Sequence, residues 1–291
     1  MTNILTVDVE DYFHPTEVQR SVDPSAWDSL PSRVEQATSI VLELFDAAGV
    51  NATFFILGWV ARRHPSLVRR IAAAGHEVAC HSFAHSLISS LTPHQFRQDT
   101  RDAADAIAQA CGARPRAYRA PSFSITARSL WALEILLECG FTTDSSIYPV
   151  RHDRYGIPGH PCFPHRIQTP SGHILEVPPA AVPLGAARNA PAGGGAYLRL
   201  LPYAYTAASI RILNRAHSVP ACLYVHPWEF DPDQPRLAAG AVARWRTYLG
   251  LRSMARKLSR LIAEFSFAPL AIVCPPHDAY PSFRPASARS A

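Results

Sequence analysis

Short β-rich runs alternate with helical patterns along most of this chain of 291 residues. Strands are predicted for residues 4–8, 52–57, 76–81, 116–120, 141–144, 173–178, 221–226 and 268–273. Parallel strands need a long crossover between them, and a helix usually supplies it. The alternation therefore predicts an α/β fold with seven or eight mostly parallel strands, either closed into a distorted barrel or open and doubly wound.

Capping patterns mark the predicted helices. A capping box of the type S-x-x-E begins an apolar helical period at Ser32, and a second box begins one at Thr92. Helices are thus predicted between residues 32 and 49, 65 and 75, 92 and 112, 126 and 139, and 241 and 265.

The middle of the chain is less regular. Proline, glycine and histidine are frequent in residues 148–220, and AGGGAY at 192–197 is expected to form a flexible loop. We predict a single domain over residues 1–281 with an irregular insertion at about 148–220. The residues 282–291 are rich in Pro, Ser and Arg and are predicted to be a disordered tail.

Composition narrows the function classes. Hydrophobic residues make up 48% and charged residues 18%, which is typical of a globular protein. The net charge is +5, but the arginines are scattered without a basic stripe, so no nucleic-acid partner is expected. The six cysteines form no C-x-x-C pair and are expected to be free thiols. No transmembrane segment and no export signal is apparent.

Five predicted strands end in side chains that can do chemistry. Asp8, His81, Arg119, Asp144 and His226 stand at or directly after strand ends. The carboxyl ends of parallel strands form the active-site face of α/β folds, so these groups are expected to lie together at that end of the sheet. A single polar strand end carries little information, but five of these types predict a functional site.

Two histidines and an acidic cluster predict a metal site. His81 and His85 are four residues apart in HSFAH, and in a helical turn both imidazoles would face one ion. The spacing alone is weak, because such pairs also line ordinary loops. A carboxylate from the cluster Asp8-Val-Glu10-Asp11 would complete a site of two histidines and one carboxylate, and the cation would offset the repulsion among the acids.

The remaining candidates have both chemical and structural interpretations. His226, in HPWEF, fits a general acid because imidazole titrates near neutrality, or it is a loop histidine before a proline turn. Arg119 either forms a local ion pair or keeps a carboxylate ionised and oriented. Tyr148 and Trp228 either pack in the core or face a sugar.

Together these motifs resemble the polysaccharide deacetylase family with a NodB-homology domain, carbohydrate esterase family 4. The likeness is greatest to the subgroup associated with exosortase-type exopolysaccharide gene clusters. The motifs are TVDVEDYF, HSFAH, YRAPSFSI, DSSIYP, EVPP and HPWE, at residues 6–13, 81–85, 118–125, 144–149, 176–179 and 226–229. They span most of the chain, and their combination is specific.

The resemblance implies a distorted (β/α) barrel that hydrolyses N-acetyl groups on amino-sugar polymers. Asp8 matches the family's base, and His81 and His85 match its metal histidines. Arg119 matches the arginine that orients the base, and His226 matches the acid.

The chain also departs from the family pattern. Its usual Asp-Asp pair is absent, so the third metal ligand is open between Glu10, which strand alternation favours, and Asp11, which a bulge would favour. Asp144 matches a catalytic motif only loosely. Tyr224 stands where an aliphatic residue is usual, and Ser122-Phe123 replaces a glycine region. The substrate-binding candidates are Pro121, Tyr148 and Trp228.

The implied cofactor is a divalent metal, Zn²⁺ with Co, Mn or Ni as alternatives. The implied partner is an N-acetylated oligo- or polysaccharide, or its precursor in exopolysaccharide biosynthesis. Without an export signal, the expected location is the cytoplasm or the inner face of the membrane. Two alternatives stay open: a metal-dependent hydrolase of another C–N amide such as a ureide, and a non-catalytic carbohydrate-binding relative.

Overall fold

A computed structural model describes residues 1–19, 21–185, 188–237, 240–276 and 279–284. Its main sheet has the order β10-β1-β2-β3-β4-β5-β7-β6-β12, and β11 pairs with β1 outside this path. The seven strands from β10 to β7 run parallel, and β6 is antiparallel to β7. The predicted α/β class is confirmed. No pairing joins the two ends of the sheet in the described part of the chain.

The strands of the main sheet are β1 (Asn3–Val9), β2 (Thr53–Ile56), β3 (Glu77–Cys80), β4 (Ala117–Tyr118), β5 (Thr143–Asp144), β6 (His165–Thr169), β7 (Gly172–Glu176), β10 (Cys222–Val225), β11 (Phe267–Ala268) and β12 (Ser282–Phe283). A separate antiparallel pair joins β8 (Ala181–Pro183) and β9 (Asn189–Pro191). The helices are α1 (Thr16–Gln19), α2 (Val34–Ala48), α3 (Gly58–Arg63), α4 (Pro65–Ala73), α5 (Pro93–Cys111), α6 (Trp131–Glu138), α7 (Ala196–Leu200), α8 (Tyr203–Ala216), α9 (Ala241–Tyr248), α10 (Met254–Glu264) and α11 (Leu270–Val273).

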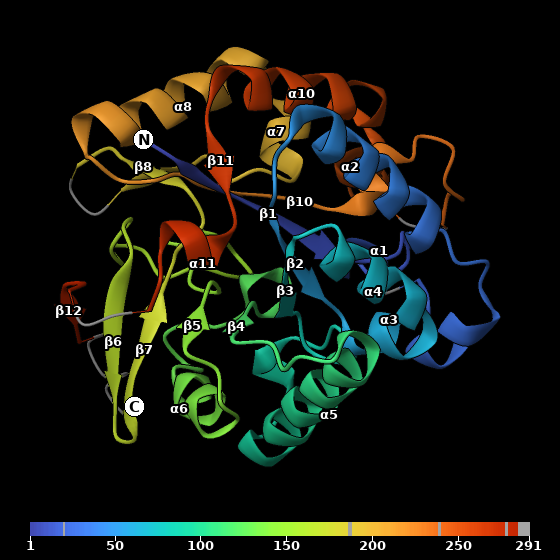
Figure 1. The fold of residues 1–291 in the computed structure, drawn as a ribbon, viewed down its shortest axis with the longest axis horizontal. Helices are drawn as coiled ribbons and strands as arrows, with labels where there is room; N and C mark the ends of the chain where they lie inside the picture. The colour runs from blue at the N-terminus through green and yellow to red at the C-terminus, as the bar shows by residue number, and fades with distance from the viewer. Residues whose placement is uncertain (20, 186–187, 238–239, 277–278, 285–291) are drawn as a thin grey trace.

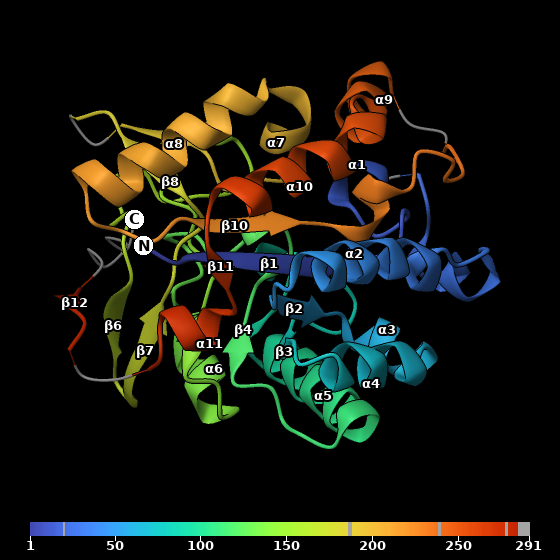
Figure 2. The ribbon, with the colours of Figure 1, turned by 45° about the horizontal axis from the view of Figure 1, so that its top comes forward.

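The helices pack around the sheet on several sides. Figure 2 shows α8 and α10 above β10 and β1, while α3, α4 and α5 lie beyond β2 and β3. Figure 1 shows α6 next to β4 and β5. This covering buries every residue of β1, as expected for a central strand of a parallel sheet.

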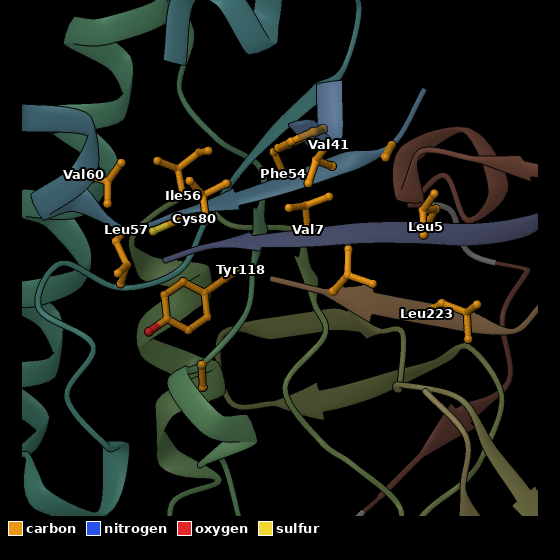
Figure 3. Close-up of a cluster of buried hydrophobic side chains, with 14 of the residues drawn as sticks. Leu5, Val7, Val41, Phe54, Ile56, Leu57, Val60, Cys80, Tyr118 and Leu223 are labelled. Carbon is orange, nitrogen blue, oxygen red and sulfur yellow. The ribbon is translucent and has the colours of Figure 1, made fainter. Parts of the chain in front are cut away.

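Strand alternation divides the buried side chains of the sheet between two faces. Figure 3 shows one face, where Val7 of β1 lies near Phe54 of β2 and Val41 of α2. Ile4 belongs instead to a smaller cluster on the opposite face. Because side chains alternate along a strand, Asp8 points to the same face as Ile4. This alternation decides which strand-end residues can meet.

The ends of two helices test the capping predictions. The Thr92 capping box is confirmed at α5, and Gly112 ends that helix at φ 80°. The Ser32 box is wrong. Helix α2 begins at Val34 after Arg33, and the Ser32 hydroxyl donates to Asp11 instead of capping a backbone N–H.

Two predictions near the C-terminus are also wrong. The helix predicted over 241–265 is divided into α9 and α10, because Gly250 between them adopts a left-handed conformation at φ 82°. The strand predicted over 268–273 is instead the short β11 followed by α11. Pro269 lacks a backbone N–H for a sheet ladder and stands at the N-cap of α11.

The irregular insertion contains more structure than its sequence suggests. Residues 148–220 hold β6, β7, β8, β9, α7 and α8. The AGGGAY segment is held against β10: Tyr224 N donates to Gly193 O (2.6 Å), and Gly195 N donates to Tyr224 O (2.8 Å). The predicted tail begins with β12, which pairs with β6, whereas residues 285–291 lie outside the described residues.

None of the helices in the described ranges combines the length and apolar character needed to cross a bilayer.

Candidate active site

Strand alternation brings Asp8 and Arg119 together at the end of the sheet. The Asp8 carboxylate accepts from Arg119 Nη1 at 2.7 Å, and both residues are buried. Arg119 is itself fixed by donation to Thr6 Oγ1 and Ser145 Oγ, and its guanidinium lies 4.2 Å from the Phe55 ring centroid. Burial disfavours a charged arginine, but Asp8 outweighs this and raises the Arg119 pKa. Arg119 therefore stays charged and orients Asp8.

Glu10 meets both predicted metal histidines. Its Oε1 lies 3.2 Å from His81 Nε2 and 3.0 Å from His85 Nε2. All three residues are buried, and each offers one possible metal-ligand atom. Within the described residues, these three atoms lie within 4.8 Å of one another. Burial alone would raise the Glu10 pKa, but His85 and His226 outweigh it and hold that pKa well below its ordinary value. The arrangement offers two imidazole nitrogens and one carboxylate oxygen.

The HSFAH segment positions its histidines without the predicted helical turn. It is a loop in which Ser82 and His85 have φ values of 64° and 53°. The Asp99 carboxylate of α5 accepts from the backbone N–H groups of Phe83 and Ala84 (2.9 and 3.3 Å), which supports the loop from outside. The imidazoles converge as predicted, but the conformation behind this prediction was wrong. Asp99 had no recognisable signal in the sequence.

Asp11 has a different task from Glu10. Its carboxylate accepts from the backbone N–H groups of Arg33 and Val34 and from the Ser32 hydroxyl. Acidic groups at a helix N-terminus satisfy unpaired N–H groups and interact favourably with the helix dipole. Of the two candidate third ligands, the structure thus places Glu10 with the histidines and Asp11 at the start of α2.

His226 forms part of a buried ionic chain. Its Nδ1 lies 3.1 Å from Glu229 Oε2, and Glu229 Oε1 accepts from Arg199 Nε at 3.0 Å. A bond from Nδ1–H to Glu229 leaves Nε2 for the cavity. Burial alone would lower the His226 pKa, but the negative charges of Glu10 and Glu229 outweigh it and raise that pKa to about 9. Sequence analysis assigned no role to Glu229, although it follows His226 by three residues in HPWE, and it missed Arg199.

Asp144 does not join these groups, so the expectation that it lies at the same opening as Asp8 and His226 is wrong. In the register of β4 and β5, Asp144 pairs with Tyr118, so it lies one residue out of step with Arg119. Alternation therefore turns its side chain to the other face. There it accepts from Ser146 Oγ and lies beside Glu176, its register partner on β7. Burial raises the pKa of Asp144 to about 6.

A cavity of about 390 Å³ opens over the assembled groups. Asp8, Glu10 and His226 contribute to its wall, together with both histidines of HSFAH. A set of aromatic residues completes much of the lining: Phe123, Tyr155, Tyr197, Tyr224, Trp228 and Trp245. Aromatic faces of this kind suit a sugar ring.

One of the three predicted substrate-binding residues reaches this cavity. Trp228 lines it, stacks on His226 at 5.2 Å between ring centroids and donates to Glu10 Oε2. Pro121 and Tyr148 are not among the lining residues. Pro121 is buried in a 3₁₀ turn, and the Tyr148 hydroxyl is used by Ala180 O and Gly193 N. The Tyr224 ring, which the sequence marked only as a departure, does line the cavity.

Two family models match adjoining parts of the chain. Residues 25–143 match the model described as polysaccharide deacetylase, and residues 145–274 match one described as a domain of unknown function (DUF3473). The first match agrees with the predicted resemblance to the polysaccharide deacetylases over residues 25–143, while the exopolysaccharide-associated subgroup stays a prediction.

Curated relatives match a limited stretch. A chitooligosaccharide deacetylase of Bradyrhizobium sp. (strain ANU 289) is 36% identical over 100 residues, covering 34% of this chain and 43% of the relative. A peptidoglycan-N-acetylglucosamine deacetylase of Bacillus cereus is 30% identical over 98 residues, covering 33% of this chain and 36% of the relative. The chain therefore spans less than half the length of these two relatives.

Solved structures share the fold over most of the chain. A Mycobacterium smegmatis protein assigned to the polysaccharide deacetylases superposes with a TM-score of 0.62 at 22% identity, covering 93% of this chain and 87% of the other. A family 4 carbohydrate esterase from Streptomyces lividans gives 0.50 at 17% identity, covering 92% and 91%. At these identities the matches support the fold alone.

Proposed function

We propose that this protein is a metal-dependent hydrolase that removes N-acetyl groups from amino sugars of a polysaccharide or its precursor. One observation carries the proposal. Asp8, His226 and the cluster of Glu10, His81 and His85 all line the same cavity. Amide hydrolysis needs a base, a site for positive charge and an acid. Each can be supplied here by a different side chain.

The residues present fit a divalent cation. His81 Nδ1 lies 2.8 Å from the carbonyl oxygen of Arg119, which favours a proton on Nδ1 and leaves Nε2 as the metal-facing nitrogen. Two histidines and a carboxylate suit Zn²⁺ and other divalent transition metals and leave positions open. When bound, such a cation polarises a carbonyl and makes water more acidic. His81, His85 and Glu10 are the proposed ligands.

The other residues divide the proton transfers. Asp8, held in place by Arg119, accepts a proton from the attacking water as the water oxygen bonds to the acetyl carbon. His226 donates a proton from Nε2 to the sugar nitrogen as the C–N bond breaks. The products are acetate and a free amine. Arg119 and Glu229 position Asp8 and His226 respectively, without contacting the reacting atoms.

Several wider assignments belong to the same proposal. The substrate class follows the names of the curated relatives, which are deacetylases of chitooligosaccharide and of peptidoglycan N-acetylglucosamine. We place the reaction in exopolysaccharide biosynthesis, in the cytoplasm or at the inner face of the membrane. We also propose one domain over residues 1–281, since β1 pairs on one side with β2 of the first matched segment and on the other side with β10 of the second.

Acetate release tests the proposal directly. Purified protein loaded with Zn²⁺ should release acetate from N-acetylated chitooligosaccharides, and a chelator should stop the release. Asp8→Asn should abolish it while leaving bound metal unchanged. Metal binding without acetate release from any N-acetylated sugar would favour a carbohydrate-binding protein, and activity on ureides alone would favour the other C–N hydrolases.

A further inference from the structure

Helix α9 carries an unpartnered apolar face. Val242, Trp245 and Leu249 have exposed fractions of 65%, 54% and 49%. Their spacing of three and four residues places them on one side of the helix and its C-cap. They are three of the eight large hydrophobic residues that are exposed in the described part of the chain. Burying such a stripe in water-free surroundings is favourable.

The stretch of chain that carries this face is strongly basic. Between Asp233 and Glu264 the sequence contains seven cationic residues and no acidic residue. Arg244 and Arg246 belong to α9 itself and are exposed. Exposed tryptophan and aliphatic side chains flanked by arginine are typical of helices that lie in the interface of an anionic bilayer. A soluble polyanion would explain the arginines but not the apolar stripe.

The same helix forms the rim of the candidate active site. Trp245 and Arg246 line the cavity. Arg199, the ion-pair partner of Glu229, also donates to the carbonyl oxygens of Arg246 and Leu249 (2.6 and 2.5 Å). One buried guanidinium thus fixes the C-terminal turn of α9 next to the His226 chain. The exposed stripe and the opening of the cavity therefore lie beside each other.

We propose that α9 docks on an anionic phospholipid surface. Val242, Trp245 and Leu249 enter the interfacial layer, and the arginines of α9 contact the headgroups. The opening of the cavity then lies at the bilayer surface and receives an N-acetylated sugar attached to a lipid. This identification of the substrate class rests on the proposed function, whereas docking itself does not.

Vesicle binding tests the docking surface. The intact chain should co-sediment with vesicles rich in phosphatidylglycerol and much less with pure phosphatidylcholine. Val242→Glu, which lies outside the cavity, should weaken binding by at least about tenfold, and Arg244→Gln by about fivefold. Ile272→Glu is the matched control, because Ile272 is 71% exposed on α11 and should leave binding unchanged. Equal binding to neutral vesicles, or equal loss in both glutamate variants, would overturn the proposal.

A second measurement separates docking from catalysis. Val242→Glu should release acetate from a soluble chitooligosaccharide at the parent rate but should be slower on an N-acetylated glycolipid in phosphatidylglycerol vesicles. Unchanged rates on both substrates would refute the docking inference and leave the deacetylase proposal intact. Vesicle binding without acetate release from either substrate would support docking and refute the deacetylase proposal. Dimers that Val242→Glu dissociates in the absence of lipid would instead assign α9 to self-association and overturn membrane docking.

Discussion

Glu229→Gln should move the alkaline limit of activity to lower pH. In the proposed reaction His226 acts as the protonated acid, so activity is retained below its pKa and lost as pH rises through it. The Glu229 carboxylate lies 3.1 Å from His226 Nδ1 and is fully buried, so its charge favours the imidazolium strongly. Substitution by glutamine keeps the shape and an oxygen for Arg199 but removes that charge.

The size of the effect follows from this contact. A hydrogen bond to a charged group contributes about 1.5–3 kcal/mol, and one pKa unit corresponds to about 1.36 kcal/mol. Loss of the charge should therefore lower the His226 pKa, which is about 9 in the parent protein, by about 1–2 units. Glu10 also raises this pKa, but a bound cation would offset its charge. Glu229 and Asp8 are thus the negative charges that still raise the His226 pKa in the metal-loaded protein, and Glu229 is the one hydrogen-bonded to the ring.

The assay is the pH dependence of kcat/KM for acetate release, together with an NMR titration of the His226 ring in metal-free protein. Both midpoints should move downward in Glu229→Gln. Glu43→Gln, the same change at an exposed position of α2, should move neither. A lower rate at every pH with an unchanged alkaline limb and an unchanged titration would refute the assignment of Glu229 as the group that holds the proton on His226.

Three further predictions use other parts of the site. Arg119→Met leaves Asp8 buried without its partner and should lower the free energy of unfolding by about 3–5 kcal/mol in urea titrations. Gly194→Ala should cost about 1–3 kcal/mol in the same assay, because the backbone is at φ 123° and a Cβ would lie 2.0 Å from Tyr224 O; Gly240→Ala, with open space around it, should cost far less. Glu10→Gln should weaken Zn²⁺ binding measured by calorimetry. Losing a residue that only hydrogen-bonds to a metal ligand weakens binding roughly 10- to 100-fold, and loss of a ligand itself should weaken it more. An unchanged affinity would exclude Glu10 as a ligand.

Strand ends could be read from the sequence, whereas side-chain direction required the register. The rule that parallel strands present their carboxyl ends together placed Asp8, His81 and His226 correctly around one cavity, with Arg119 buried next to Asp8. It failed for Asp144, because alternation allows every second residue to reach a given face. The paired positions of β4 and β5, which decide this parity, depend on tertiary pairing and not on local sequence.

Local patterns were least informative where a distant residue took over their role. Ser32 and Glu35 match the sequence pattern of a capping box, but Asp11, just after β1, accepts from the first N–H groups of that helix instead. The Asp11 carboxylate therefore points away from the histidines that Glu10 contacts. Gly250 divides a continuous amphipathic pattern because left-handed backbone is accessible to glycine at little cost. Glu229 escaped notice since a glutamate three residues after a strand end is common, and only burial reveals its partners.

The cavity lies across the boundary between the two matched segments. His81 and His85 lie in the segment that matches the polysaccharide deacetylase model, and Asp8 and Glu10 precede that segment. His226, Glu229 and Arg199 lie in the segment that matches the domain of unknown function. Strand β10 pairs with β1 along Ile4–Val7, so the site is completed only when the second segment joins the N-terminal part of the chain. Residues 1–143 supply the proposed base and the proposed metal ligands, which would suit any acetamide. The second segment supplies the proposed acid, much of the aromatic wall and the α9 rim, and we infer that it selects which acetamide-bearing molecule reaches them.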